Sequence, residues 1–278
     1  MTGPDWAPGR GGDTESPPPP GNGQPLLELR KVDKNFGPVQ ALVGIDLTVP
    51  RGQVTALVGD NGAGKTAMIK TISGIWPPDG GSIHWEGHPV HMHNPKDAAA
   101  LGITTVYQDL ALCDNLDIVQ NMFLGHEVLH FEILDEINME LTARSTLDSL
   151  AVTTIRSIRQ PVASLSGGQR QIVAVARAVM SNSQLVILDE PTAALGVAQT
   201  AMVLDLVKRL SSQGVTVLMV SHNLNDVFEV ADRLVILHLG HLVAEGPASD
   251  FDRQLTVDYM TTGRAQREAS SAASSEAN

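Results

Sequence analysis

The feature that most constrains this chain is a glycine-rich octapeptide between an apolar run and a helical pattern. Its sequence, Gly59-Asp60-Asn61-Gly62-Ala63-Gly64-Lys65-Thr66, has the spacing G-x-x-x-x-G-K-[ST] of a phosphate-binding loop. The run Thr55 to Gly59 before it predicts a buried strand. The helix predicted after it stops near Gly74 and carries one apolar face, made of Met68, Ile69, Ile72 and Ile75. This order predicts an α/β fold with a phosphate-loop nucleoside triphosphatase core.

The loop also predicts how a nucleotide is held. Glycines let backbone N–H groups approach phosphate oxygens closely, and the N-terminal end of the following helix adds positive potential. We therefore expect all eight residues, 59–66, to contact ATP. Lys65 is expected to reach the β- and γ-phosphates, and the Thr66 hydroxyl is expected to bind Mg²⁺.

Further apolar runs predict the rest of the fold. They are rich in Val, Ile and Leu, which suits strands buried on both faces of a mostly parallel sheet. These runs are Ile103 to Gln108, Leu185 to Asp189, Val215 to Ser221 and Leu234 to Leu237. Residues 26–50 and 81–93 alternate between polar and apolar side chains, and glycine and proline interrupt them, so they predict a small antiparallel β subdomain.

The composition along the chain predicts one nucleotide-binding domain between two tails. Residues 1–25, with the proline run 17–20, and the Ser- and Ala-rich residues 263–278 contain too little apolar material to order, so we expect two disordered tails around a domain at 26–262. Between about 109 and 165 the strand signal fades, which predicts an inserted helical subdomain. Asp135 is expected to cap one of its helices, with apolar positions at Ile137, Leu141, Leu147 and Leu150.

Two carboxylates stand at the end of a predicted buried strand. Asp189 and Glu190 follow Leu185-Val186-Ile187-Leu188, where negative charge is costly unless a metal or hydrogen bonds compensate for it. In a chain with a phosphate loop, we predict Asp189 as a Mg²⁺ partner and Glu190 as the general base for the attacking water.

The pentapeptide Leu165-Ser166-Gly167-Gly168-Gln169 resembles the signature of the ATP-binding cassette family, a likeness that extends over roughly residues 26–260. In that family the signature is a second anion site, formed by a serine hydroxyl and glycine amides at a helix N-terminus. The resemblance implies that Ser166, Gly167, Gly168 and Gln169 contact the ATP of a second, head-to-tail cassette. It therefore implies a homodimer or a pair with a sister ATPase.

Three more roles are implied by the resemblance alone. Gln108 matches the loop glutamine that touches Mg²⁺ and links the site to a membrane partner. His222 matches the switch histidine at the γ-phosphate, and Phe36 lies where the family places an aromatic ring against adenine. Two positions depart from the family: Ala67 follows Thr66 in place of a second hydroxyl residue, and Gly196 ends the loop Ala193-Ala194-Leu195 where an aspartate is usual.

The sequence around 102–109, 121–125 and 189–196 resembles the ATP subunits of monosaccharide importers of the ribose and fructose type. Many of these fuse two cassettes, whereas this chain has one. The resemblance implies transmembrane permease subunits as partners and, indirectly, an extracytoplasmic sugar-binding protein. An ATPase of another transporter class, a soluble cassette ATPase and a regulator that has lost hydrolysis are the alternatives.

Composition narrows these alternatives. The 19 Lys and Arg residues against 31 Asp and Glu give a net charge of −12, so the chain lacks the basic excess that nucleic-acid binding needs. It has no apolar run of ~20 residues that could span a bilayer, no apolar signal core, and one cysteine, Cys113. We therefore expect a peripheral protein on the cytoplasmic face of the cell membrane, with no nucleic acid as partner. His88, His91 and His93 have no cysteine or carboxylate at ligand spacing, so we expect no metal site there.

Overall fold

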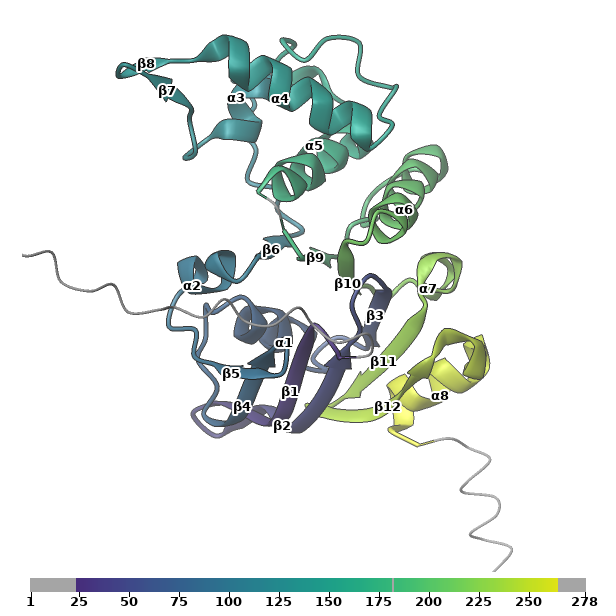
Figure 1. The fold of residues 1–278 in the computed structure, drawn as a ribbon. Helices are drawn as coiled ribbons and strands as arrows, with labels where there is room; N and C mark the ends of the chain where they lie inside the picture. Colours follow the sequence, from purple (N-terminus) through teal and green to yellow (C-terminus); the bar gives the residue numbers. More distant parts are fainter. Residues whose placement is uncertain (1–23, 182, 265–278) are drawn as a thin grey trace, which may run out of the picture.

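The structure is a computed structural model that describes residues 24–181 and 183–264. The predicted tails, 1–25 and 263–278, lie largely outside these residues. The described chain contains a six-stranded sheet, a four-stranded sheet and a group of helices (Figure 1). The predicted fold class is therefore confirmed.

The six-stranded sheet carries the strands that the apolar runs predict. Its order is β12-β11-β3-β10-β9-β6, and every neighbouring pair is parallel except β11 and β12. The strands are β3 (Val54–Gly59), β6 (Ile103–Val106), β9 (Leu185–Asp189), β10 (Thr216–Val220), β11 (Arg233–His238) and β12 (His241–Pro247). Every residue of β3 and β10 is buried, as expected for strands that are covered on both faces.

The four-stranded sheet is antiparallel, in the order β2-β1-β4-β5. Its strands are β1 (Leu27–Phe36), β2 (Val39–Val49), β4 (Gly80–Trp85) and β5 (His88–Val90). Alternate side chains such as Leu27 and Leu29 point into one hydrophobic core, which they share with Leu57 of β3 and Met68 of α1 (Lys65–Ile72). The small sheet thus packs beside the phosphate loop.

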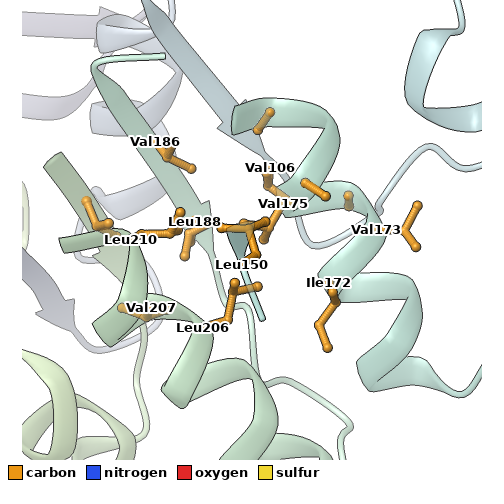
Figure 2. Close-up of a cluster of buried hydrophobic side chains, with 14 of the residues drawn as sticks. Val106, Leu150, Ile172, Val173, Val175, Val186, Leu188, Leu206, Val207 and Leu210 are labelled. Atoms are coloured by element: carbon orange, nitrogen blue, oxygen red, sulfur yellow. The ribbon is translucent and has the colours of Figure 1, made fainter. Parts of the chain in front are cut away.

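The second core lies on the other side of the large sheet. Figure 2 shows Val186 and Leu188 of β9 facing side chains of the helices α5 and α6, including Val175, Leu206 and Leu210. The helices beyond α1 are α2 (Pro95–Ala100), α3 (Ile118–Phe123), α4 (Glu136–Ser149), α5 (Gly167–Met180), α6 (Val197–Ser212), α7 (Leu224–Val230) and α8 (Arg253–Thr262), with short 3-10 turns at Val162–Ser164 and Ala248–Asp250.

The helices α3, α4 and α5 gather at one end of the molecule, drawn in teal at the top of Figure 1, together with a hairpin of β7 (Leu129–His130) and β8 (Ile133–Leu134). Asp135 caps α4 as predicted, because its side chain accepts the Asn138 backbone N–H at 3.1 Å. Within the segment at about 109–165 that was predicted to be a helical subdomain lie α3, the hairpin and α4, whereas α5 follows it.

Two predicted apolar faces need correction. In α4, Ile137 and Leu141 are 75% and 58% exposed, whereas Leu147 and Leu150 are buried as predicted. The inward positions of the first turns are Met139 and Ala143, which also repeat every four residues. Ile75 is 38% exposed, because α1 ends at Ile72 and the chain turns at Gly74, whose φ is +72°. Among the described residues, none of the helices combines the length and apolarity that a bilayer crossing requires.

Candidate nucleotide-binding site

The topology of the large sheet brings the predicted site residues together. The strands β3, β10, β9 and β6 are consecutive neighbours and run parallel, so their carboxyl ends meet at one edge of the sheet. The phosphate loop follows β3, Gln108 follows β6, the Asp189-Glu190 pair ends β9, and His222 follows β10. A cavity of about 450 Å³ lies there, lined by Asp60 to Ala67 and by Gln108, Asp189, Glu190, Ala193 and His222.

The phosphate loop needs glycine at two positions for steric reasons. A Cβ at Gly64 would lie 2.6 Å from the Ala41 carbonyl oxygen, and φ at Gly64 is +107°, a conformation that side chains disfavour. A Cβ at Gly59 would lie 2.6 Å from the Leu237 carbonyl oxygen. Gly64 is also the N-cap of α1 and provides no side-chain cap. The first N–H groups of this helix therefore remain available to an anion.

Lys65 is held across the loop. Its Nζ donates to the carbonyl oxygens of Gly59 at 2.7 Å and of Asp60 at 3.1 Å. These bonds hold the Lys65 side chain, which lines the cavity, within the loop, and phosphate oxygens would form stronger, charge-assisted hydrogen bonds with its ammonium group.

Asp189 has the electrostatic environment of a cation ligand. Burial raises the pKa of its carboxyl group, the neighbouring Glu190 charge raises it further, and Lys65 and Lys70 lower it. The ionised carboxylate is thus costly here, and a divalent cation would relieve that cost. Thr66 and Gln108 line the same cavity, and their side chains carry the kind of oxygen ligand that Mg²⁺ prefers.

Glu190 is held in an unusual backbone conformation beside His222. Its φ is +49°, in the left-handed region that non-glycine residues adopt uncommonly. Its N–H donates to the Val220 carbonyl oxygen at 2.9 Å. His222 Nδ1 lies 2.8 Å from Glu190 Oε1, so the ring can donate from Nδ1 to the carboxylate and present Nε2 to the cavity. The side chain of Glu190 is 15% exposed and that of His222 is 64% exposed.

The predicted anion site at Ser166 does not join this cavity. Ser166 is the N-cap of α5, and it forms a capping box with Gln169, with bonds of 3.3 and 3.0 Å. The two glycines pack against the segment that starts α6. A Cβ at Gly168 would lie 3.0 Å from Gln199 Cβ, and one at Gly167 would lie 2.9 Å from Leu195 Cδ2. The residues 166–169 are absent from the cavity lining.

Phe36 also lies apart from the cavity lining. Its ring is 40% exposed on β1 and packs edge-on against Trp76, with ring centroids 4.6 Å apart. Lys34 Nζ lies 5.6 Å from the Phe36 centroid, and Lys70 Nζ lies 4.4 Å from that of Trp76. The adenine contact at Phe36 stays a prediction, and Trp76 is a neighbour that the sequence did not indicate.

Other contacts of the site escaped sequence reasoning. Ala67 and Ala193 line the cavity, and small apolar side chains give no chemical signal. Arg177 of α5 donates to the carbonyl oxygens of Leu110 at 3.1 Å and Ala111 at 3.3 Å, so it ties the segment after Gln108 to the helix that Ser166 caps. In the part of the chain that the structure describes, His, Cys, Asp and Glu side chains form no group of three or more suited to a metal ion.

Comparison with known proteins places this chain among transport ATPases. The pattern of the ABC transporter family matches residues 42–193. The fructose import ATP-binding protein FrcA of Rhizobium meliloti is 45% identical over 245 residues, which are 86% of this chain and 94% of that protein. The xylose/arabinose import ATP-binding protein XylG of Sulfolobus acidocaldarius is 44% identical over 237 residues, 85% of this chain and 94% of that protein.

A solved structure agrees with these sequence relatives. The crystal structure of a nucleotide-free ATP-binding cassette from an ABC transporter superimposes with a TM-score of 0.70 at 26% identity. The match covers 80% of this chain and 91% of that one.

Proposed function

The chain belongs to the ABC transporter family of ATPases, and on that premise we propose that it is the ATP-hydrolysing subunit of a sugar importer. The observation that carries the proposal is the single cavity shared by the phosphate loop, Gln108, the Asp189-Glu190 pair and His222. Phosphoryl transfer needs hydrogen-bond donors to the phosphates, oxygen ligands for a cation, and a base. The residues of this cavity can supply all three. We assign them to one nucleotide-binding domain at 26–262 with a helical subdomain at about 109–165.

Each residue of the site has its own role in the proposed hydrolysis of ATP. The loop amides of 59–66 and the Lys65 ammonium group neutralise the phosphate oxygens of ATP. Thr66, Gln108 and Asp189 would hold Mg²⁺, which when bound supplies charge compensation at the β- and γ-phosphates. Glu190 accepts the proton of the attacking water, and His222, oriented by its bond to Glu190, donates to the γ-phosphate. The residues 166–169 act on the ATP of an opposing cassette, and Phe36 stacks on adenine.

The substrate class rests on the relatives. FrcA and XylG are named for the import of fructose and of xylose or arabinose, and we extend monosaccharide import to this chain. The cavity contains phosphate-binding chemistry and no sugar-specific feature, so the permease and an extracytoplasmic sugar-binding protein would select the sugar.

The partners are inferred from the family. The resemblance of residues 166–169 to the family signature implies that they act on a second cassette, an identical copy or a sister subunit, that faces this one head to tail, and their place outside the cavity of their own chain is consistent with that arrangement. The permease would hold this pair at the cytoplasmic face of the cell membrane as a peripheral ATPase. Fractionation of cells with and without the permease tests the location, and stable attachment in its absence would contradict it.

Two substitutions test the assignment of the site. Lys65→Ala should weaken ATP binding, because it removes positive charge from the phosphates. Glu190→Gln should keep ATP binding and stop turnover, because it removes only the base. ATP binding by calorimetry and phosphate release are measured for both variants, with Lys208→Ala as a control for the loss of one exposed lysine that pairs with Glu229.

The outcomes are distinct. The Glu190→Gln variant should also accumulate as an ATP-bound dimer, because the γ-phosphate would hold the two cassettes together. Normal turnover in Glu190→Gln would remove the assignment of the base, and a strictly monomeric species at saturating ATP with the permease present would contradict the shared site.

A further inference from the structure

The tip of the β1–β2 hairpin extends beyond its pairing with β4. β1 pairs with β4 up to Asp33, opposite Gly80, whereas it pairs with β2 as far as Phe36, opposite Val39. The register of β1 on β2 also shifts on both sides of Lys34. A hairpin tip with one neighbouring strand is usually among the more mobile parts of a sheet. Without further contacts, the Phe36 ring would therefore adopt several orientations.

One carboxylate fixes the backbone of this tip. Asp79, in the segment between α1 and β4, accepts the Asn35 backbone N–H at 2.6 Å and the Lys34 ammonium group at 2.9 Å. Lys34 Nζ also donates to the Pro77 carbonyl oxygen at 2.8 Å. The bonds to Asp79 lower the pKa of its carboxyl group, with the Asn35 N–H as the largest cause, so the carboxylate is charged at neutral pH. Both residues before Phe36 are thus tied to one segment.

The same segment holds the Phe36 ring. Trp76 packs edge-on against it, with ring centroids 4.6 Å apart, and Lys34 Nζ lies 5.6 Å from the centroid of the Phe36 ring. Trp76 is fixed in turn, because its backbone N–H donates to the Lys70 carbonyl oxygen at 3.0 Å and Lys70 Nζ lies 4.4 Å from the centroid of its ring. These neighbours restrain an aromatic ring that remains 40% exposed.

The hairpin contacts the phosphate loop directly. A Cβ at Gly64 would lie 2.6 Å from the Ala41 carbonyl oxygen of β2. Phe36 pairs with Val39, two residues before Ala41. Because a strand rises about 3.4 Å per residue, the ring is carried about 7 Å along β2 from that contact. A restrained, exposed aromatic ring at this spacing suits the flat base of a nucleotide whose phosphates lie in the loop.

We propose that Trp76 and Asp79 are positioning residues for the base of ATP. Trp76 fixes the Phe36 ring, and Asp79, through Asn35 and Lys34, fixes the backbone that carries it. A ring that is ordered before binding costs less affinity than one that must be ordered by the ligand. The inference rests on the proposed function, because it requires that Phe36 stacks on adenine. It adds two residues from outside the cavity lining on which that contact depends.

Tripolyphosphate separates the two halves of the nucleotide site, because it can occupy the phosphate loop but has no base. Calorimetry measures the binding of Mg²⁺–ATP and of Mg²⁺–tripolyphosphate to the full chain and its variants. Phe36→Ala should weaken ATP binding by about tenfold, and Trp76→Ala and Asp79→Ala should each weaken it by about threefold to tenfold. Tripolyphosphate binding should stay at the wild-type level in all three. The KM for ATP should rise by the same factors while kcat changes little, because a loss of uniform binding raises KM alone.

A double-mutant cycle tests whether both residues act through the ring. In the Phe36→Ala background, Trp76→Ala and Asp79→Ala should cause no further loss of ATP affinity, because no ring is left to position. Trp76→Phe should restore most of the affinity that Trp76→Ala loses, since it keeps an aromatic contact with Phe36.

A second variant at Asp79 guards against misfolding. Asp79→Ala leaves the buried Lys34 ammonium group without its carboxylate and lowers stability. Asp79→Asn keeps the size of the side chain, and its single oxygen accepts from one of the two donors, so it should weaken ATP binding less than Asp79→Ala does. A variant that fails to fold loses both ligands, whereas a positioning defect affects ATP alone.

Asp46 provides the matched control. Its carboxylate accepts the Lys31 backbone N–H at 2.9 Å, which is the same kind of bond to the same strand, but five residues before Phe36. Asp46→Ala should therefore leave the binding of both ATP and tripolyphosphate unchanged.

The outcomes separate the inference from the proposed function. Weaker ATP binding in Phe36→Ala, together with wild-type binding in Trp76→Ala and Asp79→Ala, overturns the inference and leaves the proposed function standing. Additive losses in the double variants, or equal losses of ATP and tripolyphosphate in folded protein, also overturn it, because they show an effect that bypasses the ring. Unchanged ATP binding in Phe36→Ala removes the adenine contact and the inference with it. No ATP hydrolysis by the wild type with its permease overturns the proposed function itself.

Discussion

Gly196 is the position where the structure makes the sharpest stability prediction. It is the N-cap of α6, its φ of −74° is open to any residue, and nothing lies within 4 Å of where a Cβ would stand. No side chain caps α6. In Gly196→Asp, the new carboxylate can accept the backbone N–H of Ala198 or Gln199 and lies at the positive end of the helix.

The size of the effect follows from three small terms. Replacing an N-cap glycine by aspartate stabilises the folded protein by a few tenths of a kcal/mol. The negative charge at the helix N-terminus adds about 0.3–1 kcal/mol, and the smaller conformational freedom of the unfolded chain adds about 0.4–1 kcal/mol. Because the first two overlap, we expect about 1 kcal/mol in total. That corresponds to a rise in unfolding temperature of about 2–4 °C for a domain of this size.

The assay compares Gly196→Asp with Gly196→Ala and Gly196→Asn by differential scanning calorimetry. The alanine variant restricts the unfolded chain but is a poorer N-cap than glycine, and the asparagine variant supplies a neutral cap, so stability should rise in the order Ala, Asn, Asp. An equal gain in all three, or a loss in Gly196→Asp, would refute the capping argument.

Activity tests the second consequence of this glycine. We expect the isolated wild-type subunit to hydrolyse ATP slowly with little cooperativity, because Gly196 offers no side chain to an opposing cassette. Gly196→Asp should raise cooperativity over a range of ATP concentrations. A wild-type subunit that is already fully active and cooperative without permease, and unchanged by the substitution, would remove any mechanistic meaning from this position.

Two further predictions concern the fold and the carboxylate pair. Met139→Ala should destabilise the protein by about 2–4 kcal/mol, whereas Ile137→Ala, at an exposed position of the same helix, should change stability by less than about 0.5 kcal/mol. Chemical denaturation measures both free energies of unfolding. Equal losses of stability in the two variants would contradict the burial of the Met139 face of α4. Asp189→Asn should abolish Mg²⁺-dependent hydrolysis yet stabilise the nucleotide-free protein at neutral pH. Burial and the Glu190 charge raise the pKa of Asp189 above its ordinary value of 3.8. As the pH rises above 3.8, the folded wild type therefore holds this proton more tightly than the unfolded chain does, and it loses stability relative to the variant until the folded carboxyl group has also ionised. A pH series of unfolding temperatures in which the gap fails to widen would contradict this.

The strand before the phosphate-loop motif and the helix after it could be predicted from the sequence because the motif and its context are local. The strand before Gly59, the helix after Lys65 and the stop at Gly74 all lie within 20 residues, so short-range rules suffice. The same rules located the carboxylates at the end of β9. The order of the strands was beyond them, because β3, β10, β9 and β6 are neighbours out of chain order and only tertiary packing decides that arrangement.

Other features left no trace in the residue pattern. In α4, Ile137 with Leu141 and Met139 with Ala143 have the same spacing, so periodicity alone could not choose which pair is buried. The left-handed backbone conformation of Glu190 could not be predicted, because the residue is neither glycine nor asparagine, the types that usually indicate this conformation. The pairing of Phe36 with Trp76 joins β1 to the residues that follow α1, a contact that depends on how the small sheet packs.

The site itself shows why function and stability oppose each other here. Asp189 and Glu190 are adjacent carboxylates at the end of a buried strand, and burial of the first and repulsion between the two raise the pKa of Asp189. Glu190 also has a strained backbone, although its N–H bond to Val220 fixes that conformation. Lys65 offsets part of the negative charge, but its ammonium group also donates to two loop carbonyls. The folded protein therefore retains excess negative charge beside a loop whose backbone N–H groups can donate hydrogen bonds to phosphate. A bound cation compensates the charge of the carboxylates, and a bound phosphate chain compensates the positive potential of the loop. A cation without phosphate, or phosphate without a cation, would leave one of these two groups uncompensated. The arrangement that weakens the fold therefore favours binding of a metal–nucleotide complex over binding of free nucleotide.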